Sequence, residues 1–219
     1  QFNNKNDFDK YPRVVKEDIM LLKESACDLV FCPDEDEMFP EPPKEIFDLG
    51  SLNTVMEGKF RPGHFNGVVT VVKKLFEIVS PDKAFFGLKD FQQLAVIKKM
   101  VKDFSINVEI IECETVRESD GLAMSSRNMN LSPYFRKNAS NISKILFEAR
   151  NLSNAMSPLE VKKYVIDKIT ENSDFSLEYF EIINSDSLKN VSNWTEKPVI
   201  GCIAVYTGGV RLIDNIKFN

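Results

Sequence analysis

The chain has 219 residues, of which 43% are hydrophobic and 28% are charged, a balance typical of a globular protein that can bury a full core. Its formal net charge of −5 argues against a general nucleic-acid surface, and no apolar run approaches the length of a membrane span. We therefore expect no nucleic acid and no membrane among its partners. A single histidine and four cysteines without CxxC spacing argue against a zinc site, and reduced thiols in a cytoplasmic protein are the simplest account of the cysteines.

The first half of the chain alternates predicted helices and strands. Helices are inferred from apolar residues at helical spacing, and strands from short apolar runs bounded by proline, glycine or charged residues. Such alternation predicts a parallel sheet with helices on both faces. The predicted elements are, in order, a helix over residues 14–26, a short buried strand over 28–32, an edge strand over 45–52, a glycine- and proline-punctuated loop over 56–65, a helix over 67–79, a buried strand over 83–86, a helix over 91–104 and a strand over 108–113.

The pattern changes after Val116. A polar loop over residues 117–130 is followed by two helices and then by strands, and the Gly208-Gly209 pair predicts a hairpin between the last two strands. Two helices followed by an antiparallel sheet predict a small α+β domain. We therefore expect two domains, residues 1–115 and 116–219, that face each other across a cleft. The predicted helices cover 132–152 and 158–170, and the strands cover 178–183, 199–206 and 210–213.

The stretch GLKDFQQ, residues 87–93, joins the predicted strand 83–86 to the predicted helix that follows. Gly87 at a strand end lets a ligand approach the backbone closely, and the start of a helix favours an anion. Lys89 adds a charge suited to phosphate, and Asp90 can cap the helix or accept a hydrogen bond from a sugar hydroxyl. Taken alone, such a stretch is more often an ordinary turn with a solvated lysine and a capping aspartate.

Three basic loops lie outside the ends of predicted strands. In an open α/β sheet, ligands bind at the carboxyl ends of the strands, so cationic loops that converge there would suit a polyphosphate. A solvated loop remains an alternative for the first of them. The serines of the third lack a Gly-x-Ser-x-Gly context, so they are interpreted as hydroxyl donors to phosphate and not as nucleophiles. The loops carry Lys59, Arg61 and His64, then Lys89, then Arg127 beside Ser125 and Ser126.

The motifs of the chain resemble those of the pantoate–β-alanine ligase family, the pantothenate synthetases, which belong to the nucleotidyltransferase superfamily of α/β folds. The stretches that carry the resemblance follow the family's order from the first residue almost to the last. The combination of Arg-Pro-Gly-His-Phe, Gly-x-Lys-Asp-Phe-Gln-Gln and Ser-Ser-Arg-Asn is highly specific. The matching stretches are residues 1–2, 7–13, 57–65, 87–93, 120–128 and 211–215.

The resemblance implies a Rossmann-like nucleotidyltransferase domain with a smaller C-terminal α+β domain, and a two-step ligase reaction. ATP adenylates the carboxylate of pantoate and releases pyrophosphate, and the amine of β-alanine then attacks the pantoyl adenylate to give pantothenate and AMP. Such a reaction needs cations and N–H dipoles around the phosphates, with Mg²⁺ to neutralise charge. The expected ligands are therefore ATP, Mg²⁺, pantoate and β-alanine.

By resemblance, the motif residues fall into three overlapping groups. The expected catalytic residues are Lys89, Ser125, Ser126 and Arg127. The residues expected to bind ATP are these four together with Gly87, Leu88, Asp90, Val116 and Met124, with Val116 near the adenine and Asp90 towards the ribose. The residues expected to bind pantoate or β-alanine are Gln1, Gln93, Arg61 and His64.

Two departures from the family pattern qualify these expectations. Leu88 stands where the family usually has a glutamate, and we expect a modest effect because the neighbouring backbone does much of the binding. The family's opening strand and helix, with a His-x-Gly-His motif that binds the ATP phosphates, have no counterpart in the chain, and His64 belongs to a different motif. We therefore expect the chain alone to lack pantothenate synthesis, and we expect poor coverage of Leu29, Phe31, Phe85 and Phe86.

The family is dimeric, so the resemblance also implies a homodimer formed through the nucleotide-binding domain. Two alternatives stay open: a non-catalytic fragment that binds nucleotide or pantoate without turnover, and a related nucleotidyl-transfer enzyme with another acceptor. ATP binding without AMP formation would favour the fragment. Pyrophosphate release driven by a different carboxylate would favour the related enzyme.

Overall fold

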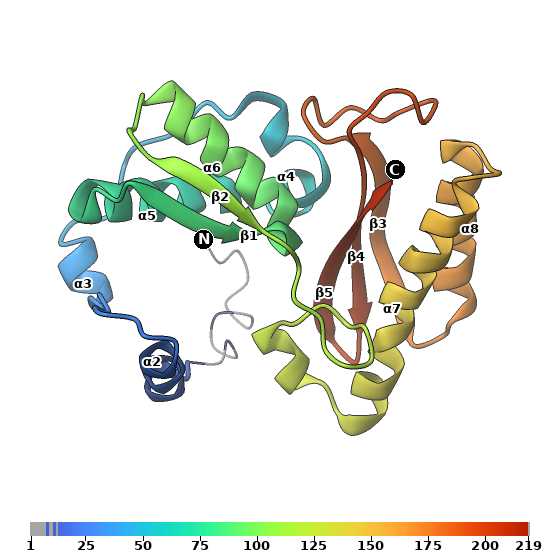
Figure 1. Ribbon diagram of the computed structural model, residues 1–219, viewed down its shortest axis with the longest axis horizontal. Helices are drawn as coiled ribbons and strands as arrows, with labels where there is room; N and C mark the ends of the chain where they lie inside the picture. Colours follow the sequence, from blue (N-terminus) through green and yellow to red (C-terminus); the bar gives the residue numbers. More distant parts are fainter. Residues whose placement is uncertain (1–7, 9–10, 12, 219) are drawn as a thin grey trace.

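The computed structural model describes residues 8, 11 and 13–218, and within these residues it contains a parallel and an antiparallel sheet with helices around them (Figure 1). No helix in this part of the chain is long and apolar enough to cross a membrane. The α-helices are α2 (Val15–Glu24), α3 (Glu35–Met38), α4 (Met56–Phe60), α5 (His64–Val79), α6 (Phe91–Asp103), α7 (Pro133–Leu152) and α8 (Pro158–Glu171). The 3₁₀ turns are η1 (Gly50–Asn53), η2 (Leu88–Asp90) and η3 (Ser126–Asn130), and the strands are β1 (Lys83–Gly87), β2 (Glu109–Cys113), β3 (Phe175–Asn184), β4 (Val199–Thr207) and β5 (Val210–Phe218).

Strands β1 and β2 pair in parallel, which confirms the parallel arrangement that the alternating pattern predicts. Lys83 lies opposite Glu109 at one end of the pair, and Gly87 lies opposite Cys113 at the other. Both strands therefore end at the same edge. Since the connections that follow parallel strands emerge together at that edge, the η2 turn after β1 and the loop after β2 are brought near each other.

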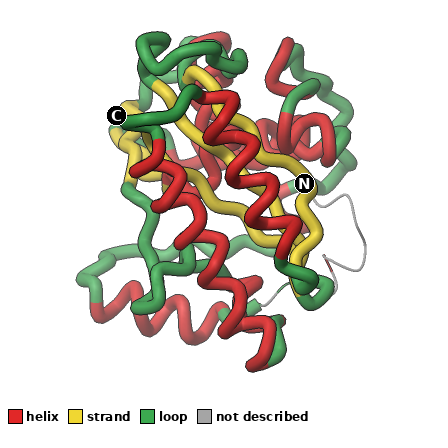
Figure 2. Tube along the Cα trace, turned by 90° about the vertical axis from the view of Figure 1, so that its right-hand side faces the viewer, coloured by secondary structure: helices red, strands yellow, loops and turns green. Residues whose placement is uncertain are grey.

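The antiparallel sheet has β4 in its centre, and side chains on its two faces belong to two different hydrophobic clusters. Ile203 and Val205 of β4 pack with residues of α7 and α8, which lie across the sheet in Figure 2. Cys202 and Ala204 pack on the other face, with residues of α5 and α6 from the first half of the chain. Because both faces are covered, the strand reads in the sequence as one continuous apolar run. The helix–helix–sheet order and the Gly208-Gly209 hairpin are confirmed, although β5 extends five residues beyond the predicted end at residue 213.

Two predicted strands of the first half are absent from the described structure. Residues 28–32 form no strand, and no residue described in the structure pairs with them. The edge strand predicted over residues 45–52 is also wrong, because the side chain of Asn66 on α5 takes the place of a neighbouring strand. Its Oδ1 accepts the N–H of Phe47 at 2.9 Å, and its Nδ2 donates to the carbonyl of Glu45 at 3.1 Å.

The loop predicted over residues 56–65 is largely helical. Helix α4 occupies Met56–Phe60, and α5 begins at His64, three residues earlier than predicted. Gly63 allows this early start, since it precedes α5 with a φ of 81° in the left-handed region that glycine adopts readily. Gly58 allows α4 to lie directly against the carbonyl of Leu52, which a Cβ at position 58 would approach to 2.2 Å.

Several apolar side chains of the first half are exposed, as expected from the sequence. Leu29 is 79% exposed, Phe31 45% and Phe85 66%, so the expectation of poor coverage is confirmed for these three residues. The same exposure shows that the prediction of buried strands over 28–32 and 83–86 was wrong at these positions. The expectation of poor coverage is wrong for Phe86, which is partly buried against the cluster that contains α5 and α6.

The close approach at Gly58 predicts a specific destabilisation. We expect Gly58→Ala to lower the free energy of unfolding by about 1–3 kcal/mol, because the new methyl group meets backbone atoms that can give way only if α4 moves. Gly87→Ala is the matched control, since a Cβ there meets no atom within 4 Å. Denaturant unfolding of both variants checks this prediction, and equal stability losses would contradict it.

Candidate active site

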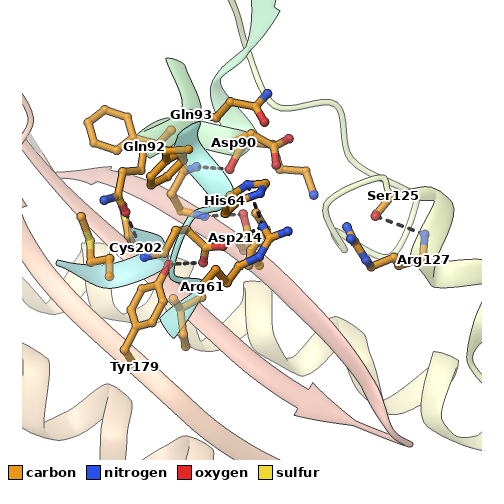
Figure 3. A pocket seen from close by; sticks show the side chains of 18 of the residues that line it. Arg61, His64, Asp90, Gln92, Gln93, Ser125, Arg127, Tyr179, Cys202 and Asp214 are labelled. Atoms are coloured by element: carbon orange, nitrogen blue, oxygen red, sulfur yellow. Dashed lines mark hydrogen bonds and ion pairs between the residues drawn. The ribbon is translucent and has the colours of Figure 1, made fainter. Parts of the chain in front are cut away.

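The carboxyl ends of β1 and β2 lead into two segments that line one cavity of about 460 Å³ (Figure 3). The first segment is η2 with the start of α6, and the second is the loop that enters η3. Residues of α4, the start of α5 and strands β3–β5 also line the cavity, together with Tyr11. A second cavity, of about 490 Å³, adjoins the first. The two share Arg61, Lys89, Asp90, Ser125, Arg127 and Ile213. Both volumes lie in the range of small-molecule sites.

Most residues selected from the sequence line the first cavity, and four described ones do not. One of these is Lys59, an exposed residue whose Nζ lies 5.5 Å from the ring centre of Phe60. Leu88 is buried, and Gly87 ends β1 with open space where a Cβ would lie. The side chain of Val116 is 66% exposed, while its carbonyl accepts the N–H of Met124 at 3.0 Å. Gln1 lies outside the described residues. The selected residues that the cavity brings together are Arg61, His64, Lys89, Asp90, Gln93, Met124, Ser125, Ser126 and Arg127.

The two predicted phosphate loops face one space. Lys89 and Ser126 line the same cavity, as the sequence predicts. In Figure 3, Ser125 and Arg127 lie on one side of this cavity, opposite Arg61 and His64. The hydroxyl of Ser125 accepts the backbone N–H of Arg127 at 3.3 Å, which caps η3. The cavity therefore gathers positive charge from three separate segments of the chain.

The loop that carries Ser125 and Arg127 is braced from within. Arg117 and Ala123 form an isolated antiparallel bridge, and the amide of Asn128 donates to the carbonyl of Ala123 at 3.1 Å and to Glu118 at 3.2 Å. Asn128 is buried, so these bonds are shielded from water and hold more firmly than exposed ones would. The polar loop predicted over residues 117–130 is thus held in one conformation by its own hydrogen bonds.

A buried carboxylate, that of Glu57 on α4, lies at the floor of the site and was missed in the sequence analysis. Its Oε1 accepts hydrogen bonds from the hydroxyl of Tyr179 at 2.7 Å and from Nη2 of Arg211 at 2.6 Å. Its Oε2 accepts from Nη1 of Arg211 at 3.0 Å and from Nη1 of Arg61 at 3.3 Å. Arg211 also forms an ion pair with Glu178. The two arginines and two glutamates balance in charge, which a largely buried ionic cluster requires.

The same cluster determines the state of His64. Nη1 of Arg61 lies 2.9 Å from Nε2 of His64. A guanidinium can only donate, so Nε2 must be the acceptor and the imidazole is neutral, with its proton on Nδ1. The ring is buried at the start of α5, where a second positive charge beside Arg61 would be unfavourable. His64 in this arrangement presents a neutral ring to the cavity.

The pKa of Glu57 is set by opposing effects. Burial alone would raise its pKa, because it disfavours the charged carboxylate. The hydrogen bonds and positive charge of Arg211, helped by Tyr179 and Arg61, outweigh burial and hold the pKa of Glu57 below its usual value. Burial beside this carboxylate also raises the pKa of the Tyr179 hydroxyl well above its usual value. Glu57 is therefore a carboxylate and Tyr179 a hydrogen-bond donor at neutral pH.

The two adjacent glutamines of α6 have different environments. Gln92 is buried, and its amide nitrogen donates to the carbonyls of Leu52 at 2.8 Å and Val55 at 3.0 Å. Its carbonyl oxygen accepts the N–H of Glu57 at 3.0 Å. The side chain of Gln92 is thus occupied by the segment that begins α4, while Gln93 is half-buried in the cavity lining. Helical spacing could have indicated that Gln92 is buried, because it lies on the same face of α6 as Val96 and Met100.

The family model described as Pantoate-beta-alanine ligase matches residues 1–217. The chain belongs to the pantoate–β-alanine ligase family. It is 50% identical over 219 residues to the pantothenate synthetase of Bacteroides fragilis (strain YCH46), a match that covers 100% of this chain and 78% of the relative. The corresponding protein of Porphyromonas gingivalis (strain W83) is 49% identical over the same length, with the same coverage.

Solved structures of this family agree with the fold. The crystal structure of pantothenate synthetase from Thermus thermophilus matches with a TM-score of 0.95 and 38% identity, covering 100% of this chain and 80% of that one. The pantoate–β-alanine ligase from Francisella tularensis, in a crystal structure described as complexed with beta-gamma ATP and beta-alanine, matches with a TM-score of 0.79 and 35% identity over 99% of this chain and 74% of that one. The predicted fold class, a nucleotidyltransferase-like α/β fold with a C-terminal antiparallel sheet, is confirmed.

The depressed pKa of Glu57 predicts how stability depends on pH. Its carboxylate stabilises the folded state above the unfolded pKa of 4.5, and this contribution is lost as pH falls through the lower folded pKa. Glu57→Gln should therefore lower the free energy of unfolding at pH 7 by about 3–5 kcal/mol and flatten the loss of stability below pH 4.5. Glu109→Gln, which breaks an exposed pair with Lys83, is the control and should cost less than about 1 kcal/mol. Denaturant unfolding as a function of pH checks this, and equal acid profiles in wild type and Glu57→Gln would contradict it.

Proposed function

We propose that the chain provides the site for the ATP-dependent condensation of pantoate with β-alanine, with pantoyl adenylate as intermediate and AMP and pyrophosphate as products. That the chain alone lacks this activity stays a prediction. The observation that supports this most directly is the convergence of Lys89, Arg127 and the serines on one cavity in a member of this ligase family. ATP and β-alanine as ligands are further supported by the description of the related Francisella tularensis structure. The same reaction is what the motifs imply by resemblance.

The nucleotide is proposed to bind between the η2 turn and the loop that enters η3. Lys89 and Arg127 supply positive charge for the phosphates, and Ser125 and Ser126 supply hydroxyl donors. These four residues are the proposed catalytic ones, because charge moves onto the phosphates as pyrophosphate leaves and preorganised donors stabilise it there. The remaining proposed ATP-binding residues are Gly87, Leu88, Asp90, Val116 and Met124.

Pantoate and β-alanine are proposed to bind beside Arg61, His64 and Gln93 on the other side of the cavity, with Gln1 added from outside the described residues. Arg61 offers guanidinium N–H donors to a carboxylate, and neutral His64 and the amide of Gln93 offer hydrogen bonds. In the first step a pantoate carboxylate oxygen bonds to the α-phosphorus as the bond to pyrophosphate breaks. In the second, the β-alanine nitrogen bonds to the acyl carbon, loses a proton, and displaces AMP.

Mg²⁺ is proposed to arrive with ATP. No group of three or more metal-binding His, Cys, Asp or Glu side chains is found in the part of the chain that the structure describes. The lining holds three carboxylates, and two of them, Glu57 and Asp214, form ion pairs with arginines. Asp90 is therefore the carboxylate proposed to lie near an Mg²⁺ ion that phosphate oxygens and water mainly hold, as in many phosphoryl-transfer sites. Bound in this way, the ion would neutralise charge on the phosphates.

The wider organisation is proposed from the order of the elements and from the family resemblance. Residues 1–115 form the nucleotide-binding part and residues 116–219 a C-terminal α+β part, consistent with β2 ending at Cys113 and the antiparallel sheet belonging to the second half. A homodimer through the first part is proposed from the family resemblance alone. Four free cysteines are consistent with a cytoplasmic protein.

Replacing the proposed phosphate-binding lysine tests the function. In a complete enzyme, Lys89→Ala should slow pantoate-dependent pyrophosphate release by about 100-fold, because loss of one preorganised charge contact costs about 3 kcal/mol in the transition state. Lys102→Ala, which removes an exposed lysine from α6, should leave the rate unchanged. ATP binding by wild-type protein without AMP formation would support the non-catalytic alternative, and a Lys89→Ala variant with normal turnover would contradict the role of Lys89.

The two glutamines of α6 provide a second test with opposite outcomes. Gln92→Ala should lower the free energy of unfolding by about 1–3 kcal/mol, because it leaves buried backbone groups without partners. Gln93→Ala should leave stability unchanged and raise the KM for pantoate about tenfold, the effect of losing one or two hydrogen bonds to a ligand. Thermal unfolding and initial-rate kinetics of both variants check this. A pantoate KM that rises in Gln92→Ala alone would reverse the assignment.

A further inference from the structure

The side chain of Asn215 on strand β5 contacts the turn that carries Lys89. Nδ2 of Asn215 donates to the carbonyl of Leu88 at 2.8 Å and to the carbonyl of Lys89 at 3.0 Å. Asn215 is buried, and it lies in the lining of the first cavity. The turn after β1 is therefore held by a residue 126 positions further along the chain.

These two bonds orient two peptide units. In a trans peptide the C=O and the N–H of one unit point in opposite directions. The carbonyls of Leu88 and Lys89 point at the Asn215 amide, so the N–H groups in the same units, those of Lys89 and Asp90, point away from it. Two successive N–H groups that face the same way form an arrangement suited to an anion.

The residue before Asn215 supports the other phosphate loop. Asp214 is buried and accepts from Nη1 of Arg117 at 2.7 Å and from Nη2 at 2.9 Å, a bidentate pair. Nη1 of Arg117 also donates to the carbonyl of Gly121 at 3.1 Å, and Nη2 donates to the carbonyl of Asn215 at 3.3 Å. The guanidinium lies 5.0 Å from the ring centre of Phe147. The base of the loop that carries Ser125 and Arg127 is thus attached to the same point of β5.

Asp214 and Asn215 also fix each other. The backbone N–H of Asn215 donates to Oδ1 of Asp214 at 2.7 Å, so the carboxylate that holds Arg117 is tied to the residue whose amide holds Leu88 and Lys89. One dipeptide on β5, an edge strand of the antiparallel sheet, therefore connects both loops. A shift of either side chain would change the separation of Lys89 from the serines.

We infer that Asn215 and Asp214 are positioning residues for the adenylation step: Asn215 orients the backbone donors of the Lys89 turn, and Asp214, through Arg117, sets the distance of that turn from the Ser125–Arg127 loop. The inference rests on the proposed function of this cavity. It assigns to these two residues no direct contact with phosphate. Their contribution is to the geometry of the groups that make the contact.

The test variant is Asn215→Asp, which keeps the size of the side chain and replaces the NH₂ donor with an oxygen that repels both carbonyls. We expect the KM for ATP to rise about tenfold and pantoate-dependent pyrophosphate release to fall about 30-fold, with the KM for pantoate unchanged. Amide hydrogen exchange at residues 88–91 should be faster in the variant. Asn215→Ala, which removes the donor without adding charge, should act in the same direction and remains usable if the aspartate variant does not fold.

The matched control is Asn138→Asp on α7, which places a carboxylate beside Asp174, away from the cavity. A loss of stability alone reduces the amount of active enzyme, so this control should lower kcat and leave each KM unchanged. Asn215 variants with an unchanged KM for ATP and unchanged exchange at residues 88–91 would overturn the positioning role while leaving the proposed function intact. Wild-type protein that neither binds ATP nor releases pyrophosphate would overturn the proposed function, and the inference with it.

Discussion

The site depends on a buried carboxylate of the first half of the chain whose hydrogen-bond and ion-pair partners come largely from the second half. Glu57 comes from α4, and its strongest partner, Arg211, comes from β5, 154 residues away. Arg61 and Tyr179 complete the cluster, and an unpaired charge at this depth would cost several kcal/mol. Because α4 cannot leave the antiparallel sheet without breaking this cluster, the position of Arg61 and His64 relative to the rest of the cavity is fixed by charge pairing.

Sequence patterns predicted the elements whose signal is local. Helices α5 to α8, strands β1, β2 and β4 and the glycine hairpin follow from periodicity, capping residues and turn chemistry within a few positions. The errors occur where the deciding partner is distant. Residues 28–32 have the apolar composition of a strand but no partner among the described residues, and the segment 45–52 is held by the side chain of Asn66. Gly58 was interpreted as a loop residue, whereas it permits a close helix contact.

The candidate site shows the same division between local and distant information. Motif resemblance located Lys89, Ser126 and Arg127, and these residues do line one cavity. Glu57 and Arg211 stand in stretches that match the family, yet no local pattern says that they pair with each other. Asn215 likewise reads as one polar residue near the end of a strand, and only the folded chain brings its amide to the carbonyls of the η2 turn. Polar contacts between residues that are far apart in the sequence could not be predicted from local patterns.

Strand β4 has a consequence for how such proteins diverge. Ile203 and Val205 belong to the interior formed with α7 and α8, while Cys202 and Ala204 belong to the interior formed with α5 and α6. Neighbouring positions on one strand are therefore constrained by different halves of the molecule. In related sequences, substitutions at 203 and 205 should accompany substitutions in α7 and α8, and those at 202 and 204 should accompany substitutions in α5 and α6. A chimaera that joins the first half of one relative to the second half of another would inherit a mismatched interior along one face of this strand.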